Sequence, residues 1–354
     1  MSVGIIGCGL IAHSHAESLH ELGVPVAAVC DLDRAQAASL ARVTGAAIAD
    51  DWRALLDRGD LAAVLVCTPP RAHREAAIGA LERGIPLYLE KPIARDLAEA
   101  RAIAEAAART GTTCAVGYQW SAIDWLDGLA QKLRGEQIGM IALRQWGGTA
   151  GRSWFVDQAA GGGQILERAS HSINLLLRLA GPVTGVAASG ARVALAGSDR
   201  PPDSEIDDVL ALTFELERGG LGSVQVVWQA RELPVSFDCQ IVTDQNRYTL
   251  DFDPHYRLST PQGIETVQMA PSVRSLERLL ADEPACSPAD ALAVLEVALE
   301  VERILTAGCA ARKARVSSRL VTECTGGSSR SSSARARSSG SLAEPSGVVS
   351  STSA

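Results

Sequence analysis

A lysine stands between a carboxylate and a proline at Glu90-Lys91-Pro92. The tripeptide follows the apolar run 85–89, and a helical stretch separates that run from an earlier apolar run, 62–67. This order predicts two parallel strands joined by a crossover helix. Because ligands of an open parallel sheet bind beyond the carboxyl ends of its strands, we expect the ammonium group of Lys91 to face a bound cofactor. A charge pair in a surface loop is the alternative interpretation.

A glycine-rich turn opens the chain with the sequence GCGLIA at 7–12, between a predicted strand and a predicted helix. In this GxGxxA pattern Gly7 permits a tight turn, and Gly9 lets a pyrophosphate approach the backbone. The helix that follows offers the free N–H groups of its first turn, including those of Leu10 and Ile11, to the phosphates. The pattern therefore predicts dinucleotide binding, and a purely structural turn is the alternative.

A carboxylate, Asp31, stands at the end of the second predicted strand, about 20 residues after the glycine-rich turn. It can accept hydrogen bonds from both ribose hydroxyls of NAD, whereas the 2′-phosphate of NADP would meet its negative charge. Leu32 follows in place of a basic residue, which also favours NAD, while Arg34 keeps NADP open. The alternative role of Asp31 is to cap the next helix.

A second group of reactive side chains follows the triglycine 161–163. Glu167 and His171 are four residues apart and Asn174 is three further on, so a regular helix would place all three on one face. A carboxylate beside a histidine can orient the ring and raise its basicity, which predicts a general base. An ion pair on a helix surface is the alternative. No third ligand is evident, so we predict no metal site.

The bulk composition narrows the class of protein. The chain has 354 residues, 47% of them hydrophobic and 21% charged, which predicts a soluble protein of two domains. A net charge of -8 argues against nucleic-acid binding, and no apolar run reaches the ~18 residues that span a bilayer.

No basic region precedes an apolar stretch at the start, so we expect a cytoplasmic protein without a signal peptide. The eight cysteines form no CxxC pair, and we interpret them as reduced, mostly buried thiols.

Apolar runs and Ala-rich helical patterns alternate over the first part of the chain. The predicted strands cover 3–6, 25–30, 62–67, 86–89 and 113–116. The predicted helices between them cover 11–22, 34–44, 73–83 and 97–110. This βαβα rhythm predicts a parallel sheet with right-handed crossovers.

The rhythm changes after about residue 121. Helices are predicted over 122–133, 167–179 and 288–305. Strands are predicted over 138–149, 183–194, 208–216, 222–230, 236–243, 246–252 and 265–269. Short turns join these strands, which indicates antiparallel neighbours. The segment 328–354 consists mainly of Ser, Arg, Gly and Ala and is predicted to be disordered.

Taken with Cys67-Thr68-Pro69-Pro70, His73 and the GGGxxxExxxH pattern at 161–171, these motifs resemble the Gfo/Idh/MocA oxidoreductases, which include glucose–fructose oxidoreductase and inositol dehydrogenase. The resemblance covers about residues 2–308. It implies an NAD(P)-binding Rossmann domain with a doubly wound parallel sheet over 1–121. It implies a C-terminal α/β domain over 122–308, with a large, open, mostly antiparallel sheet that serves substrate binding and oligomerisation. A disordered tail, 309–354, would follow.

The resemblance also implies the roles of individual residues. Lys91 would lie beside the nicotinamide and the reacting oxygen, with Glu90, Thr68, Pro69 and His73 lining the cofactor cleft. The predicted catalytic residues are Lys91, His171 and Glu167. The predicted cofactor-binding residues are Gly7, Gly9, Leu10, Ile11, Asp31, Thr68, Pro69, His73, Glu90, Lys91 and Gln119.

Three positions depart from the family pattern. Glu167 replaces the commoner aspartate, Asn174 stands where many relatives carry aspartate, and Ser121 stands where arginine is frequent. These departures bear on the substrate more than on the chemistry. Trp120, Trp146 and Trp154 are candidates for an apolar wall against a sugar face.

The expected function is NAD-dependent oxidation of a secondary hydroxyl of a sugar, cyclitol or related polyol, or reduction of the ketone. The alternatives are a non-catalytic NAD(P)-binding regulator, an NAD-assisted glycosidase and a keto-sugar reductase. The expected partners are a small-molecule substrate and further copies of the chain, with neither nucleic acid nor membrane. An open sheet face must be covered, so we expect a homodimer or homotetramer.

Overall fold

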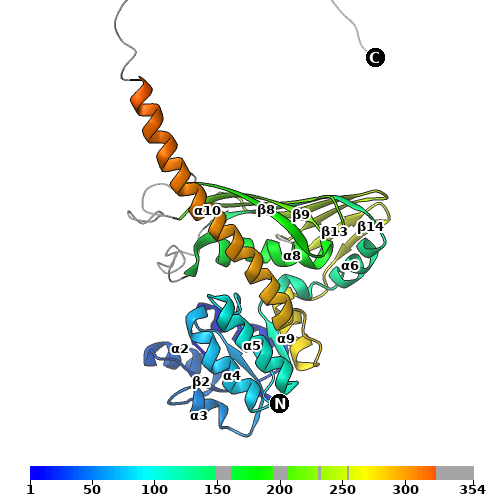
Figure 1. The fold of residues 1–354 in the computed structure, drawn as a ribbon. Helices are drawn as coiled ribbons and strands as arrows, with labels where there is room; N and C mark the ends of the chain where they lie inside the picture. The colour runs from blue at the N-terminus through cyan, green and yellow to red at the C-terminus, as the bar shows by residue number, and fades with distance from the viewer. Residues whose placement is uncertain (149–160, 194–205, 230–232, 253–254, 324–354) are drawn as a thin grey trace, which may run out of the picture. The chain divides into compact units, whose positions relative to one another are not determined.

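The computed structural model describes residues 1–148, 161–193, 206–229, 233–252 and 255–323. Within this part of the chain, Met1–Gly308 forms one compact unit that contains two β-sheets (Figure 1). Among the described residues, no helix combines the length and the apolar character needed to cross a membrane.

The first sheet has six strands, all parallel, in the order β3-β2-β1-β4-β5-β6. Its strands are β1 (Ser2–Ile6), β2 (Val26–Cys30), β3 (Ala47–Ile48), β4 (Leu61–Val66), β5 (Leu87–Leu89) and β6 (Cys114–Val116). Its helices are α1 (Leu10–Glu21), α2 (Arg34–Thr44), α3 (Trp52–Leu56), α4 (His73–Glu82) and α5 (Leu97–Thr110). The predicted parallel sheet is confirmed. The sequence prediction missed β3 and α3, which are too short to show a periodic pattern.

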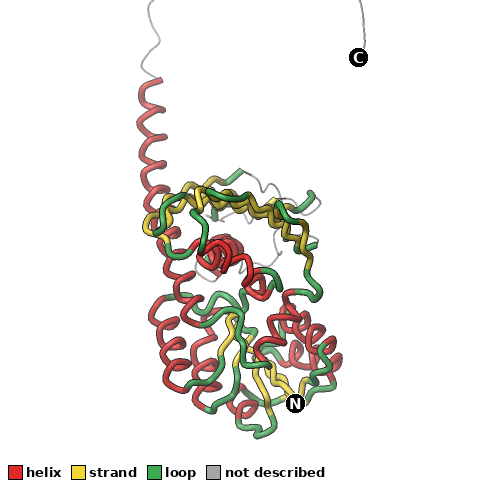
Figure 2. The backbone as a smooth tube through the Cα atoms, turned by 90° about the vertical axis from the view of Figure 1, so that its right-hand side faces the viewer, coloured by secondary structure: helices red, strands yellow, loops and turns green. Residues whose placement is uncertain are grey.

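Helices cover both faces of this sheet (Figure 2). On one face Val3 and Ile5 pack with apolar residues of α1, α2 and α9 (Pro271–Leu280), a helix that the sequence analysis missed. Leu276 and Leu279 of α9 are buried there, and Ser275 donates a hydrogen bond of 3.4 Å to the hydroxyl of Tyr88. The chain therefore returns to the first sheet after residue 270, within the segment 122–308 that the sequence analysis assigned to the second domain.

The second sheet has eight strands in the order β14-β13-β12-β11-β7-β10-β9-β8. Its strands are β7 (Ile138–Gly148), β8 (Val183–Ala191), β9 (Val209–Leu216), β10 (Leu221–Gln229), β11 (Ser236–Thr243), β12 (Arg247–Asp251), β13 (Arg257–Thr260) and β14 (Gly263–Thr266). Neighbours are antiparallel except for β7 and β10, which are parallel. The predicted large, mostly antiparallel sheet is confirmed, although β13 was not predicted and β14 begins two residues before the predicted strand 265–269 and ends within it.

One face of the second sheet is buried and the other is largely exposed. On β9, Leu210, Leu212 and Phe214 are buried while the residues between them are exposed, which is the period-two alternation of a half-buried strand. Helix α8 (Ser170–Ala180) lies along the buried face (Figure 1). The contact is close at Gly222, where an added Cβ would lie 2.6 Å from the Leu176 side chain.

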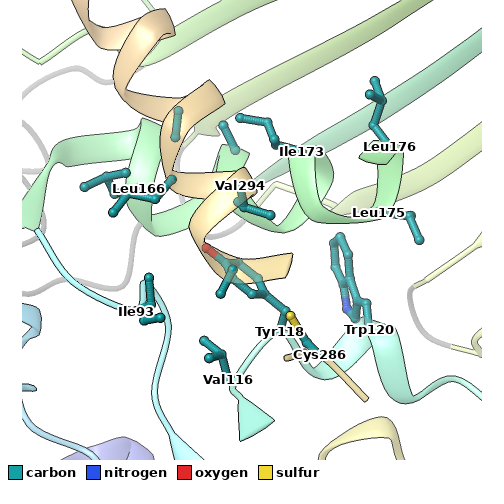
Figure 3. Close-up of a cluster of buried hydrophobic side chains, with 14 of the residues drawn as sticks. Ile93, Val116, Tyr118, Trp120, Leu166, Ile173, Leu175, Leu176, Cys286 and Val294 are labelled. Atoms are coloured by element: carbon teal, nitrogen blue, oxygen red, sulfur yellow. The ribbon is translucent and has the colours of Figure 1, made fainter. Parts of the chain in front are cut away.

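The junction between the sheets is an apolar cluster (Figure 3). Tyr118 and Trp120, which follow β6, lie there with residues of α8 such as Ile173 and with Val294 of the last helix. Residues Gln119–Ala122 form a 3-10 turn, and α6 (Leu126–Arg134) begins four residues later than the predicted helix 122–133. This cluster holds together the two segments that carry the site described below.

The last helix, α10, runs from Pro288 to Glu323 and so continues past the predicted end at residue 305. The expected unstructured segment 309–354 therefore overlaps helix over 309–323, where the sequence is rich in Ala and Arg and contains neither Gly nor Pro. Residues 324–354 lie outside the described part. Ion pairs join α10 to the elements after β5: Glu302 pairs with Arg95 of the loop before α5 (2.9 Å), and Glu296 pairs with Arg101 of α5 (3.1 Å).

Candidate active site

The glycine-rich turn connects β1 to α1 at the carboxyl end of the first sheet. Gly7 has φ +88°, and an added Cβ would lie 2.8 Å from the backbone carbon of Cys67 and the nitrogen of Thr68, so only glycine fits. Gly9 precedes the first residue of α1 and makes no side-chain cap, and no atom lies within 4 Å of where its Cβ would be. The first N–H groups of α1 are therefore open to an anion.

Asp31 holds the end of β2 against this turn. Its Oδ2 accepts a hydrogen bond of 2.6 Å from the backbone N–H of Cys8, and its Oδ1 accepts one of 2.8 Å from Asp33. The cap of α2 is Asp33, whose side chain accepts from the N–H of Ala35. Asp31 is thus not the cap that the sequence analysis offered as an alternative role.

A cavity of about 860 Å³ lies beyond the carboxyl ends of β1, β2, β4 and β5. Of the predicted cofactor-binding residues, those that line it are Gly7, Gly9, Ile11, Asp31, Thr68, Pro69, Glu90 and Lys91. The strand order changes direction between β1 and β4, so the cavity is at the topological switch point where open parallel sheets bind ligands.

Three of the predicted cofactor-binding residues do not line this cavity. Leu10 is exposed beside it, and Gln119 lines a second cavity. His73 is fully buried behind the wall, because its ring nitrogens contact the carbonyl oxygens of Thr68 (2.8 Å) and Ile93 (3.2 Å). Burial lowers the pKa of His73 below its ordinary value despite these two carbonyls. His73 therefore joins the loops after β4 and β5, and its side chain has no surface open to the cavity.

Behind Lys91, the Glu90 carboxylate makes a buried contact with His15. The distance from Nε2 of His15 to Oε1 of Glu90 is 2.6 Å, and the His15 ring lies edge-on to Tyr88 at 5.0 Å. Burial alone would raise the pKa of Glu90. The hydrogen bond and the charge of His15, together with the adjacent Lys91, have the opposite effect and outweigh burial, so the pKa of Glu90 is lowered. His15 and Glu90 are 75 positions apart in the sequence, so only the fold reveals this pairing.

Lys91 crosses from the first sheet to the segment before α8. Its Nζ donates hydrogen bonds to Oε2 of Glu167 at 2.7 Å and to the Glu167 backbone carbonyl at 2.8 Å. The two side chains are only 11% and 25% exposed. An ammonium group has three N–H donors, so one remains for a ligand.

The predicted pairing of Glu167 with His171 is wrong. Residues Ile165–Ala169 form a π-helical turn, in which the N–H of Ser170 reaches the carbonyl of Ile165, and the regular helix begins only at Ser170. Among the described residues, the Glu167 carboxylate is hydrogen-bonded to Lys91, and Nδ1 of His171 has no partner. Glu167 is turned to Lys91 instead.

Aromatic rings position His171. Its ring lies 5.7 Å from that of Tyr118, edge-on, and 5.3 Å from that of Trp120. Nδ1 is buried without a hydrogen-bond partner among the described residues, and the His171 side chain lines the second cavity. Burial, followed by the positive charges of Lys91 and Arg168, holds the pKa of His171 well below its ordinary value. His171 is therefore neutral at pH 7 and can accept a proton.

A second cavity of about 420 Å³ adjoins the first, since Glu167 lines both. It is lined by Gln119, Trp120, Gln145, Glu167, Arg168, His171, Phe237, Phe252 and Tyr256. The rings of Trp120 and Phe252 are stacked at 4.8 Å. Trp120 thus lines this cavity as predicted, Trp146 does not, and Trp154 lies outside the described residues. Arg168 was not singled out by the sequence analysis, which found no pattern pointing to it.

Two of the three departures from the family pattern contact each other. The hydroxyl of Ser121 donates a hydrogen bond of 2.7 Å to Oδ1 of Asn174, and both side chains are buried. Neither residue lines the second cavity. Asn174 follows His171 by three residues in α8, as expected, but it is bonded to Ser121 and does not line the cavity that Glu167 and His171 share.

The thiols near the glycine-rich turn are not activated. Burial, and then the charge of Asp31, raises the pKa of Cys8 and of Cys30 to about 12. Cys67 is buried as well, and its pKa is raised well above the ordinary value. All three thiols are protonated at pH 7, as expected for structural cysteines.

Comparison with known proteins identifies the family. A sequence profile described as an oxidoreductase family with an NAD-binding Rossmann fold matches residues 1–118, and the profile of the GFO/IDH/MocA C-terminal domain matches residues 136–249. The chain belongs to the Gfo/Idh/MocA oxidoreductases. The first profile spans the whole parallel sheet and its motifs, and the second begins just before β7.

Relatives of known name are dehydrogenases. Inositol 2-dehydrogenase of Pseudarthrobacter chlorophenolicus is 35% identical over 114 residues, which are 31% of this chain and 34% of that enzyme, so the match spans about a third of its length. UDP-N-acetylglucosamine 3-dehydrogenase of Acidithiobacillus ferrooxidans has a similar structure, with a TM-score of 0.72, 22% identity and coverage of 87% of this chain and 98% of that one. Levoglucosan dehydrogenase, solved with NADH, has a TM-score of 0.74 and 18% identity over 86% and 97% of the two chains. At these identities the two structures establish the fold alone.

The site of this Gfo/Idh/MocA protein fits the nicotinamide dinucleotide that the family fold implies. Only glycine can occupy position 7, the space above Gly9 is open, and the first N–H groups of α1 have no side-chain cap. The cavity of about 860 Å³ extends from there to Lys91. These are the features that phosphate groups and a nicotinamide ring require.

Proposed function

We propose that the protein is an NAD-dependent dehydrogenase that oxidises a secondary hydroxyl of a sugar, cyclitol or related polyol, or reduces the corresponding ketone. The ion pair between Lys91 and Glu167 carries the proposal, because it lies where the dinucleotide-sized cavity meets a second cavity containing the neutral His171. An ammonium donor, a carboxylate and a proton acceptor at one junction suit proton removal from a carbinol. The names of the relatives, inositol and sugar dehydrogenases, support the substrate class.

The roles proposed for the chain's own residues follow from their contacts. Lys91 donates its remaining N–H to the reacting oxygen and stabilises negative charge as it develops there. His171 takes the hydroxyl proton at Nε2. Glu167 orients the ammonium group of Lys91, and its second oxygen is available to a neighbouring substrate hydroxyl. When bound, the nicotinamide cofactor supplies the hydride acceptor.

We propose NAD as the cofactor in preference to NADP. Asp31, Asp50 and Asp51 line the cavity, as do Arg34, Arg71 and Arg74. The charge of Arg34 is engaged by Asp50 at 2.9 Å. A 2′-phosphate would be repelled by these carboxylates, whereas ribose hydroxyls can donate to them.

NADH formation tests the proposed function, measured by absorbance with a panel of inositols, hexoses and sugar acids, each with NAD and with NADP. We expect NADH with at least one substrate, and a slower rate when the carbinol hydrogen is replaced by deuterium. Binding of NAD without turnover of any substrate would indicate a regulator. Release of an aglycone without net NADH would indicate the NAD-assisted glycosidase.

We also propose a homodimer or homotetramer. The face of the second sheet opposite α8 is exposed on alternate residues of β9 and β10, and Leu221 at its end is 46% exposed. A broad sheet face of this kind is commonly covered by a second copy. Light scattering after size exclusion decides between the monomer mass of 37.1 kDa and a multiple of it.

A further inference from the structure

Arg168 places a largely buried guanidinium group in the wall of the second cavity. Its Nη2 donates a hydrogen bond of 2.7 Å to the carbonyl of Gly148, and its Cζ lies 5.5 Å from the centre of the Phe237 ring. Its Nη1 is buried and has no hydrogen-bond partner among the described residues. A buried cation with unused donors is costly unless a ligand completes its hydrogen bonds.

The backbone leaves space for this group. An added Cβ at Gly147 would lie 2.9 Å from Nη1 of Arg168 and 3.2 Å from the Phe237 ring. A side chain at position 147 would therefore push the guanidinium from its place. The glycine on β7, the ring on β11 and the carbonyl of Gly148 together hold the arginine against the cavity.

Among the described residues, Arg168 forms no ion pair of its own, and the carboxylate whose charge acts on it is Glu167. The nearest carboxylate in the sequence, Glu167, is engaged by Lys91 at 2.7 Å. No carboxylate of the described residues forms an ion pair with Arg168, and His171 is neutral. Burial lowers the pKa of Arg168 to about 10, which still leaves the group charged at pH 7.

We propose, on the basis of the proposed function, that the substrate carries a carboxylate and that Arg168 binds it. The class is a sugar acid or polyol acid, such as a hexuronate or an aldonate, whose secondary hydroxyl lies between Lys91 and His171. A planar guanidinium suits a carboxylate, and the rings of Trp120 and Phe252 offer an apolar surface to the carbon face of the sugar. The cavity of about 420 Å³ is the size of a single sugar acid.

Matched substrates test this assignment on the wild-type enzyme. Glucuronate and glucose, galacturonate and galactose, and gluconate and sorbitol differ in a carboxylate while sharing most hydroxyls. We expect kcat/KM with NAD to be about 10- to 100-fold higher for the acids, the range for one charge-assisted hydrogen bond. Equal or higher efficiency with the neutral partners would overturn the assignment and leave the proposed dehydrogenase intact. A preference for hexose 6-phosphates over hexuronates would overturn the assignment, because it would show that Arg168 binds a phosphate group and not a carboxylate. NADH formation with inositols but with none of these compounds would overturn the carboxylate assignment alone, and no NADH with either group would mean that the proposed function fails.

Variants of Arg168 supply a second test. Arg168→Gln should lose most of the preference for acids through a higher KM, and Arg168→Lys should recover part of it because the charge returns. Arg247→Gln, which removes an exposed arginine of β12 that bonds Gln240, is the matched control and should keep the preference. Titration calorimetry of the NADH-loaded variants with glucuronate gives a readout independent of turnover. Unchanged glucuronate affinity in Arg168→Gln would contradict the proposal.

Discussion

The Nζ atom of Lys91 lies 2.7 Å from Oε2 of Glu167, although the two residues are 76 positions apart in the sequence. A second hydrogen bond of 2.8 Å joins the same ammonium group to the Glu167 backbone. The pair ties the loop after β5 to the π-helical turn before α8. It therefore sets the position of the Lys91 ammonium group relative to His171, the proposed base on α8.

Replacing Lys91 should remove most of the turnover while keeping the cofactor. In Lys91→Ala we expect kcat to fall by about 10²- to 10³-fold, the usual cost of losing one donor to a developing oxyanion. The dissociation constant of NADH, measured by fluorescence titration, should change little. Lys132→Ala, on α6 and outside both cavities, is the matched control. Wild-type-like rates in Lys91→Ala would contradict the role of this residue.

Glu167 should act through Lys91 and not through His171. In Glu167→Gln we expect a lower kcat with an unchanged acidic limb of the pH–rate profile, because the histidine is held by Tyr118 and Trp120. A double-mutant cycle of Glu167→Gln with Lys91→Ala should be non-additive, since the two side chains are in contact. Additive effects in that cycle would mean that the ion pair has no part in catalysis.

His171 should set an unusually low acidic limb. Its lowered pKa means that the ring stays neutral as the pH falls through about 6.5, the ordinary value, and is protonated only below it. We expect kcat/KM to decline only below pH 6.5, and His171→Ala to lose about 10²- to 10⁴-fold in kcat together with this limb. His20→Ala, an exposed histidine of α1, is the control. A limb that persists in His171→Ala would identify another group as the base.

Substitution of the two glycines of the turn should have different effects: Gly7→Ala should lower stability, and Gly9→Ala should lower NADH affinity. Gly7→Ala requires a positive φ and a backbone clash, so we expect a loss of at least about 1–3 kcal/mol in the free energy of unfolding without cofactor. Gly9→Ala meets no atom within 4 Å, so its stability should stay within about 1 kcal/mol while NADH affinity falls. Thermal melts and NADH titrations separate the two effects. A stable Gly7→Ala protein would contradict the described turn.

Asp31 should decide the choice of cofactor. In Asp31→Ala we expect the KM for NAD to rise by about 10-fold or more, and the NAD:NADP ratio of kcat/KM to fall, because a charged acceptor for the ribose is lost. Asp33→Asn, which keeps the cap of α2 and does not line the cavity, is the matched control. An unchanged ratio in Asp31→Ala would assign cofactor choice to other residues.

Much of the fold was predictable because its signals are local. The helices 34–44 and 97–110 were predicted with the bounds that the structure has, since each has a capping aspartate before it and a glycine after it. The strands of the first sheet are short apolar runs between such helices. The elements that were missed, β3, α3, β13 and α9, are short or lie outside the βαβ rhythm.

The sequence by itself determined the parallel sheet, the glycine-rich turn and the two segments that carry Lys91 and Glu167. Each of these features depends on neighbours in the chain. Only the tertiary structure decided which side chains meet. In the π-helical turn Ile165–Ala169, Glu167 is hydrogen-bonded to Lys91, 76 positions earlier, and Arg168 lines the second cavity with His171. Contacts between residues so far apart in the chain depend on how the two sheets pack together, so no regular helical spacing could reveal them.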